Sequence, residues 1–221
     1  MMTMSRLSAI ATVLILVMSV SGTADAATPT ALVEDVEGSI PLQPLDYVSE
    51  GQVIDLGDGG RLSLGYLSSC VHEEIAGGQV TVGGGESRVE RGSVKRVRVP
   101  CDGGRLVLAA NLAVQSAATA VRAIDLNAGP EVDVHHTSPV ITLPKTGRVV
   151  IKRVDVAGER HNVETGSGEA ARTYIDLAQE GIELVPGGEY MVSVGGVAMI
   201  FRIASDAGHG DVPVLGRLVP F

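Results

Sequence analysis

Apolar residues alternate with polar ones in short runs along most of the chain, and glycines separate the runs. A period of two places neighbouring side chains on opposite faces of a β-strand. In the first half of the chain this alternation covers residues 31–40, 52–56, 61–67, 79–82 and 93–99. The Gly57–Gly60 stretch contains an Asp-Gly step, and glycine accepts the positive φ that tight turns require. We therefore expect a mainly β protein, with a hairpin turn at Gly57–Gly60.

Residues 106–124 interrupt the alternation. They are rich in Ala and Leu and contain no Gly or Pro. Alanine is the strongest helix former, so the segment predicts a short helix over residues 109–121. The alternative for Leu106–Leu108 is that these residues finish the preceding strand. Gly129 and Pro130 follow the helix, and they predict a linker over residues 127–138.

A second β unit is expected over residues 139–204. Its alternating segments are residues 148–156, 173–177, 189–194 and 197–203, and the last two are joined by Gly195-Gly196. A two-glycine connection between alternating runs is a strong hairpin signal. Residues 205–221 contain several glycines and prolines, so we expect a loose C-terminal tail there.

Tyr190 follows a Leu184-Val185-Pro186-Gly187 turn and begins one of these strands. This arrangement resembles the tyrosine corner of immunoglobulin-like sandwiches, in which the phenol hydroxyl bonds back to nearby backbone. The alternative is an ordinary half-buried strand aromatic. The resemblance implies that the second unit is a small immunoglobulin-like β-sandwich.

The first 26 residues have the pattern of a cleaved export signal. Arg6 is followed by an apolar run at Leu7–Val20, and Ala24-Asp25-Ala26 supplies the small residues that a signal peptidase accepts. A membrane-spanning helix needs roughly 20 apolar residues, and this run is shorter. We therefore expect residues 1–26 to be removed, no stable membrane span after cleavage, and a periplasmic location.

The composition argues against nucleic-acid binding. The formal net charge is −9, aromatic residues make up 3% of the chain, and Trp is absent. Proteins that hold nucleic acids use Lys and Arg contacts to phosphate and aromatic stacking on bases. We expect a protein partner in the envelope instead.

Cys70 and Cys101 are the only cysteines. An oxidising compartment favours pairing, so we expect a disulfide between them. The alternative is two buried free thiols. There is no Cys-x-x-Cys spacing to lower a thiol pKa, which makes a redox site the weaker interpretation.

The segment from Leu45 to Val82 resembles the FecR-like domain of bacterial envelope proteins. The resemblance consists of Leu45 to Ile54, the glycine-rich Gly57–Gly60 stretch and the following Arg61-Leu62-Ser63-Leu64, and it extends over about residues 33–100. Gln52 and Ser68-Ser69-Cys70 depart from the family pattern. The resemblance implies an all-β envelope domain without chemistry of its own, and we assign it to residues 31–126 with the helix included. The best-known relatives signal to a sigma factor through a membrane helix, and we do not carry this role over.

Metal and catalytic motifs are incomplete. His72-Glu73 begins a zinc-protease signature, but Ala76 occupies the place of the second histidine. His135 and His136 lie near two carboxylates, and imidazole with carboxylate suits Zn²⁺. Because adjacent strand residues point to opposite faces, we expect a solvated linker there rather than a metal site. We expect no catalytic residue, metal or cofactor.

A basic run stands out in this acidic chain. Besides Arg88 it contains the four residues that we take as a candidate face for an anionic partner, Arg91, Lys95, Arg96 and Arg98. Such a face could attract an acidic protein or an anionic envelope polymer. The alternative is the charged solvent face of a strand, since edge Lys and Arg discourage aggregation.

The sequence thus predicts a non-enzymatic exported envelope protein that acts as a protein-binding, scaffold or sensory module. The alternative is a small envelope hydrolase or metal-binding protein whose site is assembled from residues distant in the sequence.

Overall fold

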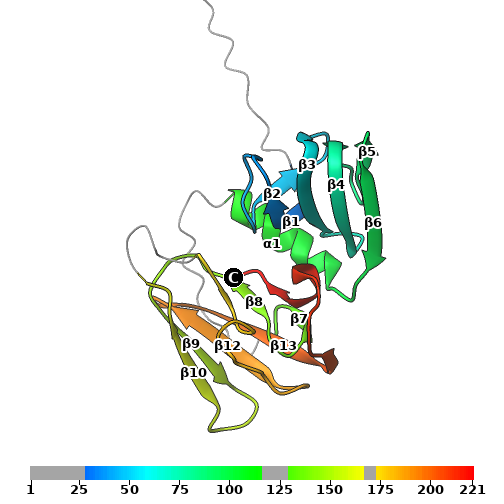
Figure 1. The fold of residues 1–221 in the computed structure, drawn as a ribbon. Coiled ribbons are helices and arrows are strands. Elements are labelled where there is room, and N and C mark those ends of the chain that lie inside the picture. The colour runs from blue at the N-terminus through cyan, green and yellow to red at the C-terminus, as the bar shows by residue number, and fades with distance from the viewer. Residues whose placement is uncertain (1–27, 116–128, 167–172) are drawn as a thin grey trace, which may run out of the picture.

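A computed structural model describes residues 28–115, 129–166 and 173–221. Figure 1 shows two β units with a helix and the C-terminal segment between them. The chain is mainly β and sandwich-like in these ranges, which confirms the fold class expected from the alternation. The expected signal peptide, the end of the expected helix and the first residues of the expected linker lie outside the described residues.

The N-terminal unit is one antiparallel sheet with the strand order β2-β1-β3-β4-β5, and β6 also pairs with β4. Its strands are β1 (Pro29–Glu37), β2 (Tyr47–Ser49), β3 (Val53–Tyr66), β4 (Val71–Thr81), β5 (Arg88–Glu90) and β6 (Ser93–Arg98). One face of this sheet carries the unit's own core, which includes Val33, Leu64 and Ile75.

The prediction of a hairpin turn at Gly57–Gly60 is wrong. Strand β3 continues through these residues and stays paired with β4, with irregular register between Asp55 and Arg61. Glycine permits a bulge as readily as a turn, so the same residues bend a long strand here. The turn between β3 and β4 lies instead at residues 67–70, where Cys70 takes a φ of 54°.

The helix α1 spans Gly103–Gln115 and begins six residues before the expected start. Asp102 caps it, since its carboxylate accepts the Arg105 N–H at 3.3 Å and its carbonyl accepts the Leu106 N–H at 3.0 Å. The alternative of a strand at Leu106–Leu108 is therefore wrong. Leu106 and Ala110 are buried against the N-terminal sheet and the C-terminal segment.

The C-terminal unit contains two sheets, with the orders β10-β9-β12-β13-β7 and β11-β8-β14. Its strands are β7 (Asp133–His136), β8 (Val140–Thr142), β9 (Arg148–Arg153), β10 (Arg160–Glu164), β11 (Tyr174–Asp176), β12 (Glu189–Val194), β13 (Val197–Gly208) and β14 (Leu218–Val219). The expected hairpin at Gly195-Gly196 is confirmed, because Val194 faces Val197 across the turn. Both glycines have positive φ.

Two expectations about this unit are wrong. Residues 133–136 of the expected linker form β7, which pairs in parallel with β13. The expected loose tail at 205–221 is ordered. β13 extends to Gly208, and the tail then forms the 3₁₀ turn η2 (Val214–Arg217) and strand β14, which pairs in parallel with β8. Parallel partners far away in sequence leave no local pattern, so neither strand showed in the alternation.

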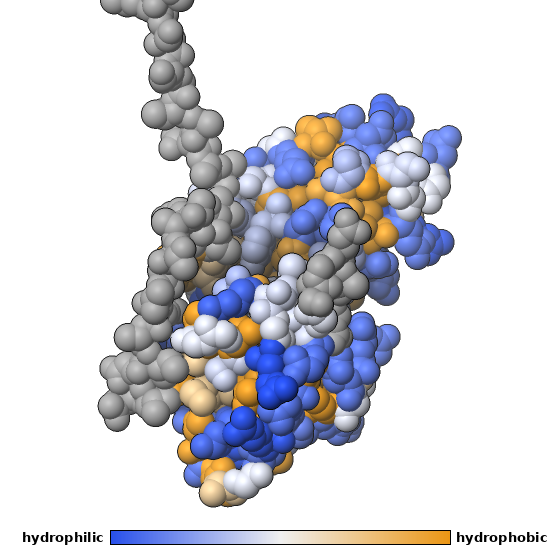
Figure 2. Space-filling view, turned by 90° about the vertical axis from the view of Figure 1, so that its left-hand side faces the viewer, coloured by the Kyte–Doolittle hydropathy of each residue, from blue (hydrophilic) through white to orange (hydrophobic). Residues whose placement is uncertain are grey.

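A third apolar cluster joins the two units. It contains residues from β1, α1, β8 and the C-terminal segment, namely Leu32, Leu67, Leu106, Ala110, Val140, Leu215 and Leu218. On the face shown in Figure 2, hydrophobic residues gather in the upper, N-terminal unit, and the lower unit is largely hydrophilic. No helix within the described ranges is long and apolar enough to cross a membrane.

Candidate functional site

Cys70 and Cys101 form the expected disulfide, with their Cα atoms 5.7 Å apart. Cys70 ends the turn before β4, and Cys101 follows β6 and precedes the cap of α1. The bond therefore closes a loop that contains β4, β5 and β6. It fixes the end of β6 beside the start of β4, and the alternative of two free thiols is wrong.

Strand β6 lies at the outer edge of the N-terminal sheet (Figure 1). All of its residues except Val94 are exposed. In the part of the chain that the structure describes, no strand pairs with the side of β6 that faces away from β4. An unpaired strand edge can accept a strand from another chain.

The ladder between β4 and β6 shows which backbone groups are free. The Val99 N–H donates to the Cys70 carbonyl at 2.9 Å, so this pair is hydrogen-bonded. Hydrogen-bonded pairs alternate along an antiparallel ladder, and the register of β6 on β4 is continuous. The backbone N–H and C=O groups of Val94, Arg96 and Arg98 therefore point away from β4.

A buried carboxylate holds this edge strand to the sheet. Glu73 of β4 is fully buried, and its Oε1 accepts hydrogen bonds from Arg96 Nε at 2.7 Å and from the Ser87 N–H at 3.0 Å. The Ser87 hydroxyl lies 2.7 Å from the Tyr66 hydroxyl. Arg96 also donates to the Ser87 carbonyl, so one guanidinium joins β6 to the loop before β5.

The structure does not gather the four residues of the candidate basic face on one side. Lys95 and Arg96 point to opposite faces of β6, and each has a partner at its register position on β4. Lys95 pairs with Glu74 at 3.1 Å, and Arg96 pairs with Glu73. Arg91 and Arg98 form no ion pair with another described residue. Two of these four positive charges are therefore compensated within the described chain, and the charges of Arg91 and Arg98 are not.

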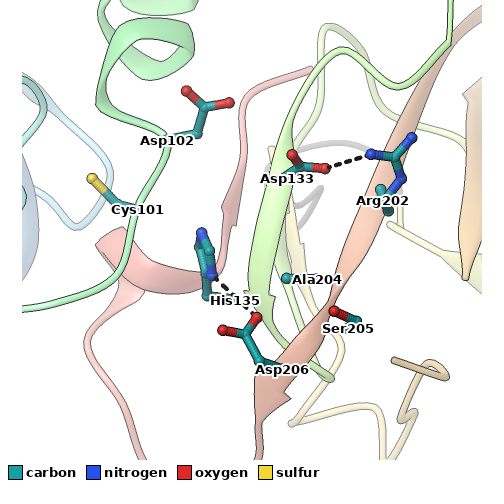
Figure 3. Close-up of a pocket in the computed structure, with 8 residues that line it drawn as sticks. All are labelled: Cys101, Asp102, Asp133, His135, Arg202, Ala204, Ser205 and Asp206. Atoms are coloured by element: carbon teal, nitrogen blue, oxygen red, sulfur yellow. Dashed lines mark ion pairs between the residues drawn. The ribbon is translucent and has the colours of Figure 1, made fainter. Parts of the chain in front are cut away.

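A polar cleft of about 430 Å³ lies where the two units meet (Figure 3). Cys101 and Asp102 border it on the N-terminal unit, and side chains from β7 and β13 border it on the other. His135 lies 3.9 Å from Asp206. Asp133 and Arg202 form a second pair in the cleft, with a nitrogen and an oxygen atom 3.6 Å apart.

His135 and His136 point to opposite faces of β7, as expected for adjacent strand residues. His136 is buried, its Nδ1 accepts the Ser138 N–H at 3.0 Å, and its Nε2 lies 2.9 Å from the Gly210 carbonyl. Both ring nitrogens are therefore engaged within the protein. The described residues contain no group of three or more His, Cys, Asp or Glu side chains arranged to hold a metal ion.

Tyr190 forms the expected corner contact. Its hydroxyl accepts the Val185 N–H at 2.9 Å, five residues upstream, and it donates to the Glu159 carboxylate. The ring is fully buried and stacks on Phe201, with the ring centroids 5.9 Å apart. Burial and the Glu159 carboxylate raise the pKa of this phenol to about 12, because both disfavour the phenolate.

Sequence reasoning missed the polar residues that connect the two units, and it considered one of them, His72, only as the start of an incomplete zinc-protease signature. They are Glu34 of β1, His72 of β4, Asp176 of β11 and Arg217 of η2. Each belongs to an ordinary alternating or turn segment, and only the packing of distant segments brings them together. Comparison of the chain with family models, curated proteins and solved structures found no match.

Proposed function

We propose that this is a non-enzymatic exported envelope protein that binds an extended segment of a partner protein at the free edge of β6. The observation that carries the proposal is the set of outward N–H and C=O groups on Val94, Arg96 and Arg98. In strand addition, a partner's backbone bonds to such groups, and neighbouring side chains give specificity.

The edge is also held in place before any partner arrives. The Cys70–Cys101 bond fixes one end of β6, and the buried Glu73–Arg96 pair fixes its middle. A pre-ordered edge lowers the conformational entropy that binding must overcome. Val97 is 45% exposed and offers an apolar contact beside the free backbone.

The sequence and the disulfide support export to the periplasm, which is part of the same proposal. The signal-like pattern at residues 1–26 and the oxidised pair agree with a compartment outside the cytoplasm. The resemblance to FecR-like domains points to an envelope module. Mass spectrometry of the exported protein is expected to find Ala27 as the first residue, and a retained leader would contradict the export signal.

Proline at residue 98 tests the edge directly. Proline has no N–H, and edge strands tolerate it where the N–H faces outward. Arg98→Pro removes one outward donor and the charge, and Arg98→Ala removes the charge alone. A photo-crosslinker at residue 97 in intact cells is expected to give a partner adduct that Arg98→Pro loses and Arg98→Ala keeps.

A crosslinker at Val156, which is exposed in the C-terminal unit, serves as the position control. Thermal melting with the disulfide intact shows whether each variant is folded. A folded Arg98→Pro protein that still forms the residue 97 adduct would exclude strand addition at β6.

A further inference from the structure

The C-terminal segment 213–219 connects the two units, and each end of the connection is polar. On the C-terminal unit, Arg217 donates to both carboxylate oxygens of Asp176 at 2.6 and 2.9 Å, and β14 pairs with β8. On the N-terminal unit, the contact is made by Glu34. Leu215 and Leu218 lie between these contacts in the apolar cluster that joins the units.

Glu34 reaches this segment because of a bulge in β1. The register of β1 on β3 shifts between Val33 and Asp35, which makes Glu34 the extra residue. A bulge re-aims the side chain of the residue that it inserts. The Glu34 carboxylate accepts the Val214 N–H and the Leu215 N–H, both at 3.0 Å, although about 180 positions separate the partners.

His72 lies beside the same carboxylate. Its Nδ1 is 3.1 Å from Glu34 Oε2, and the side chains of His72 and Glu34 are only 10% and 5% exposed. The approach is that of an ion pair rather than a directed hydrogen bond, so the contact depends on the charge of the imidazole. His72 therefore stabilises the carboxylate that holds η2.

We propose that segment 213–219 is a pH-sensitive strap, which closes the two units on each other when His72 is protonated and loosens when His72 is neutral. Protonated His72 places its positive charge beside Glu34 on one side and faces Glu74 with its other nitrogen, 3.7 Å from Glu74 Oε1. A neutral imidazole no longer supplies the positive charge on which the contact with Glu34 depends. Deprotonation of His72 therefore weakens the contact that holds the Glu34 carboxylate against η2.

The other groups around His72 do not change the charge contact between His72 and Glu34. Lys95 of β6 is positively charged, and it pairs with Glu74, the second carboxylate that His72 faces. The residues opposite His72 on β3 and β6 are Gly65 and Val97, and Leu215 of η2 lies next to Gly65. None of these three residues is charged. The contact with Glu34 outweighs burial and raises the pKa of His72 above its ordinary value.

The sign of the pH effect follows from this shift. A histidine whose pKa is raised by folding contributes stability that is fully present below about pH 6.5, the value for an unfolded chain, and is lost as the pH rises through the raised pKa. The strap is therefore tightest in mildly acidic medium. An exported protein would meet such changes directly. At the other end of the segment, burial acts to raise the pKa of Asp176, but the contacts with Arg217 outweigh burial and lower this pKa, so this carboxylate does not titrate in the same range.

Amide hydrogen exchange of the full mature chain tests the strap. The opening constants of the Val214 and Leu215 amides, corrected for intrinsic exchange, are expected to rise between about pH 5.5 and about pH 8.5 in the wild type. His72→Gln keeps a neutral polar side chain and is expected to abolish this rise. His161→Gln removes another ion-paired histidine, beside Glu159, and is the matched control that should keep it.

The wild-type protein provides a second test in case His72→Gln does not fold. The His72 ring resonance and the Leu215 amide opening must then titrate with the same midpoint. A flat opening constant in the wild type, an unchanged slope in folded His72→Gln, or two different midpoints would each overturn the strap. Loss of strand addition at β6 would leave it standing.

Discussion

Arg96 donates a 2.7 Å hydrogen bond to Glu73, a carboxylate that is completely buried in the N-terminal sheet. The two residues face each other across β4 and β6, so the pair fastens the edge strand at its middle. Glu73 Oε2 has no hydrogen-bond partner among the described residues, which leaves Oε1 to carry the charge compensation. The edge proposed to receive a partner strand is therefore held by this ion pair at its middle and by the Cys70–Cys101 bond at its end.

Arg96→Ala is expected to lower the free energy of unfolding by about 3 kcal/mol, because it leaves a buried carboxylate without its charged partner. Lys95→Ala is the matched control. Its pair with Glu74 is exposed, and such pairs contribute under about 1 kcal/mol. Urea denaturation measures both. An equal loss of unfolding free energy in the two variants would show that the buried pair stabilises the protein no more than the exposed pair does.

Reduction of Cys70–Cys101 is expected to destabilise the protein by about 3–4 kcal/mol. The bond spans a sequence separation of 31 residues, and a loop of that size gives this estimate from chain entropy. Urea denaturation with and without reductant measures the difference. In a Cys70→Ser, Cys101→Ser double variant the reductant should have no effect, and any remaining effect would point away from this disulfide.

Alkaline medium is expected to destabilise the C-terminal unit through Tyr190. Its pKa in the folded chain is about 12, whereas an unfolded tyrosine ionises near pH 10. The unfolded chain therefore releases its proton first, and stability falls as the pH rises above about 10. Denaturation at several pH values measures the slope, which should be shallower in Tyr190→Phe. An unchanged slope would place the alkaline loss elsewhere, for example at Tyr66.

Tyr190→Phe is also expected to cost about 1–3 kcal/mol near neutral pH, because the Val185 N–H and the Glu159 carboxylate lose a common partner. A loss well below this range would indicate that water replaces the hydroxyl.

Gly65→Ala is expected to strain the contact between β3 and η2. A Cβ atom at this position would lie 3.0 Å from Leu215 Cβ and would collide with the Glu34 carboxylate, so a loss of about 2 kcal/mol is expected. Gly104→Ala is the matched control. It has open space around its Cβ and lies in α1, where alanine should stabilise by up to about 1 kcal/mol. Thermal melting compares the two variants, and shifts of the same sign would contradict this packing.

The sequence was informative wherever structure is local. The alternation at residues 93–99, 189–194 and 197–203 predicted strands, and Gly195-Gly196 predicted the turn between the last two, because neighbouring residues determine both features. Gly57–Gly60 was misleading, since glycine allows a turn and a bulge at the same φ. The start of α1 was missed because Asp102 acts as a helix cap only after the preceding strand has ended.

The sequence does not predict the polar contacts between the units, and the reason is a different one. Glu34 looks like a solvent-facing strand residue until the bulge redirects it, and a one-residue shift in register changes which face a side chain occupies. Its partners on η2 lie at the far end of the chain. The candidate edge was only partly predictable, because charge alternation marks a strand but not whether its charges are already paired.

The position of β14 also affects how the protein reaches its folded state. Strands β8 and β1 are made long before residues 214–219, yet the apolar cluster between the units contains Leu215 and Leu218. During synthesis from the N-terminus, the two units can collapse separately. Leu32, Leu106 and Val140 stay exposed to solvent until Leu215 and Leu218 pack against them. Docking of the units is thus the late, non-local step of folding, and chaperones that shield apolar surface would act in that interval.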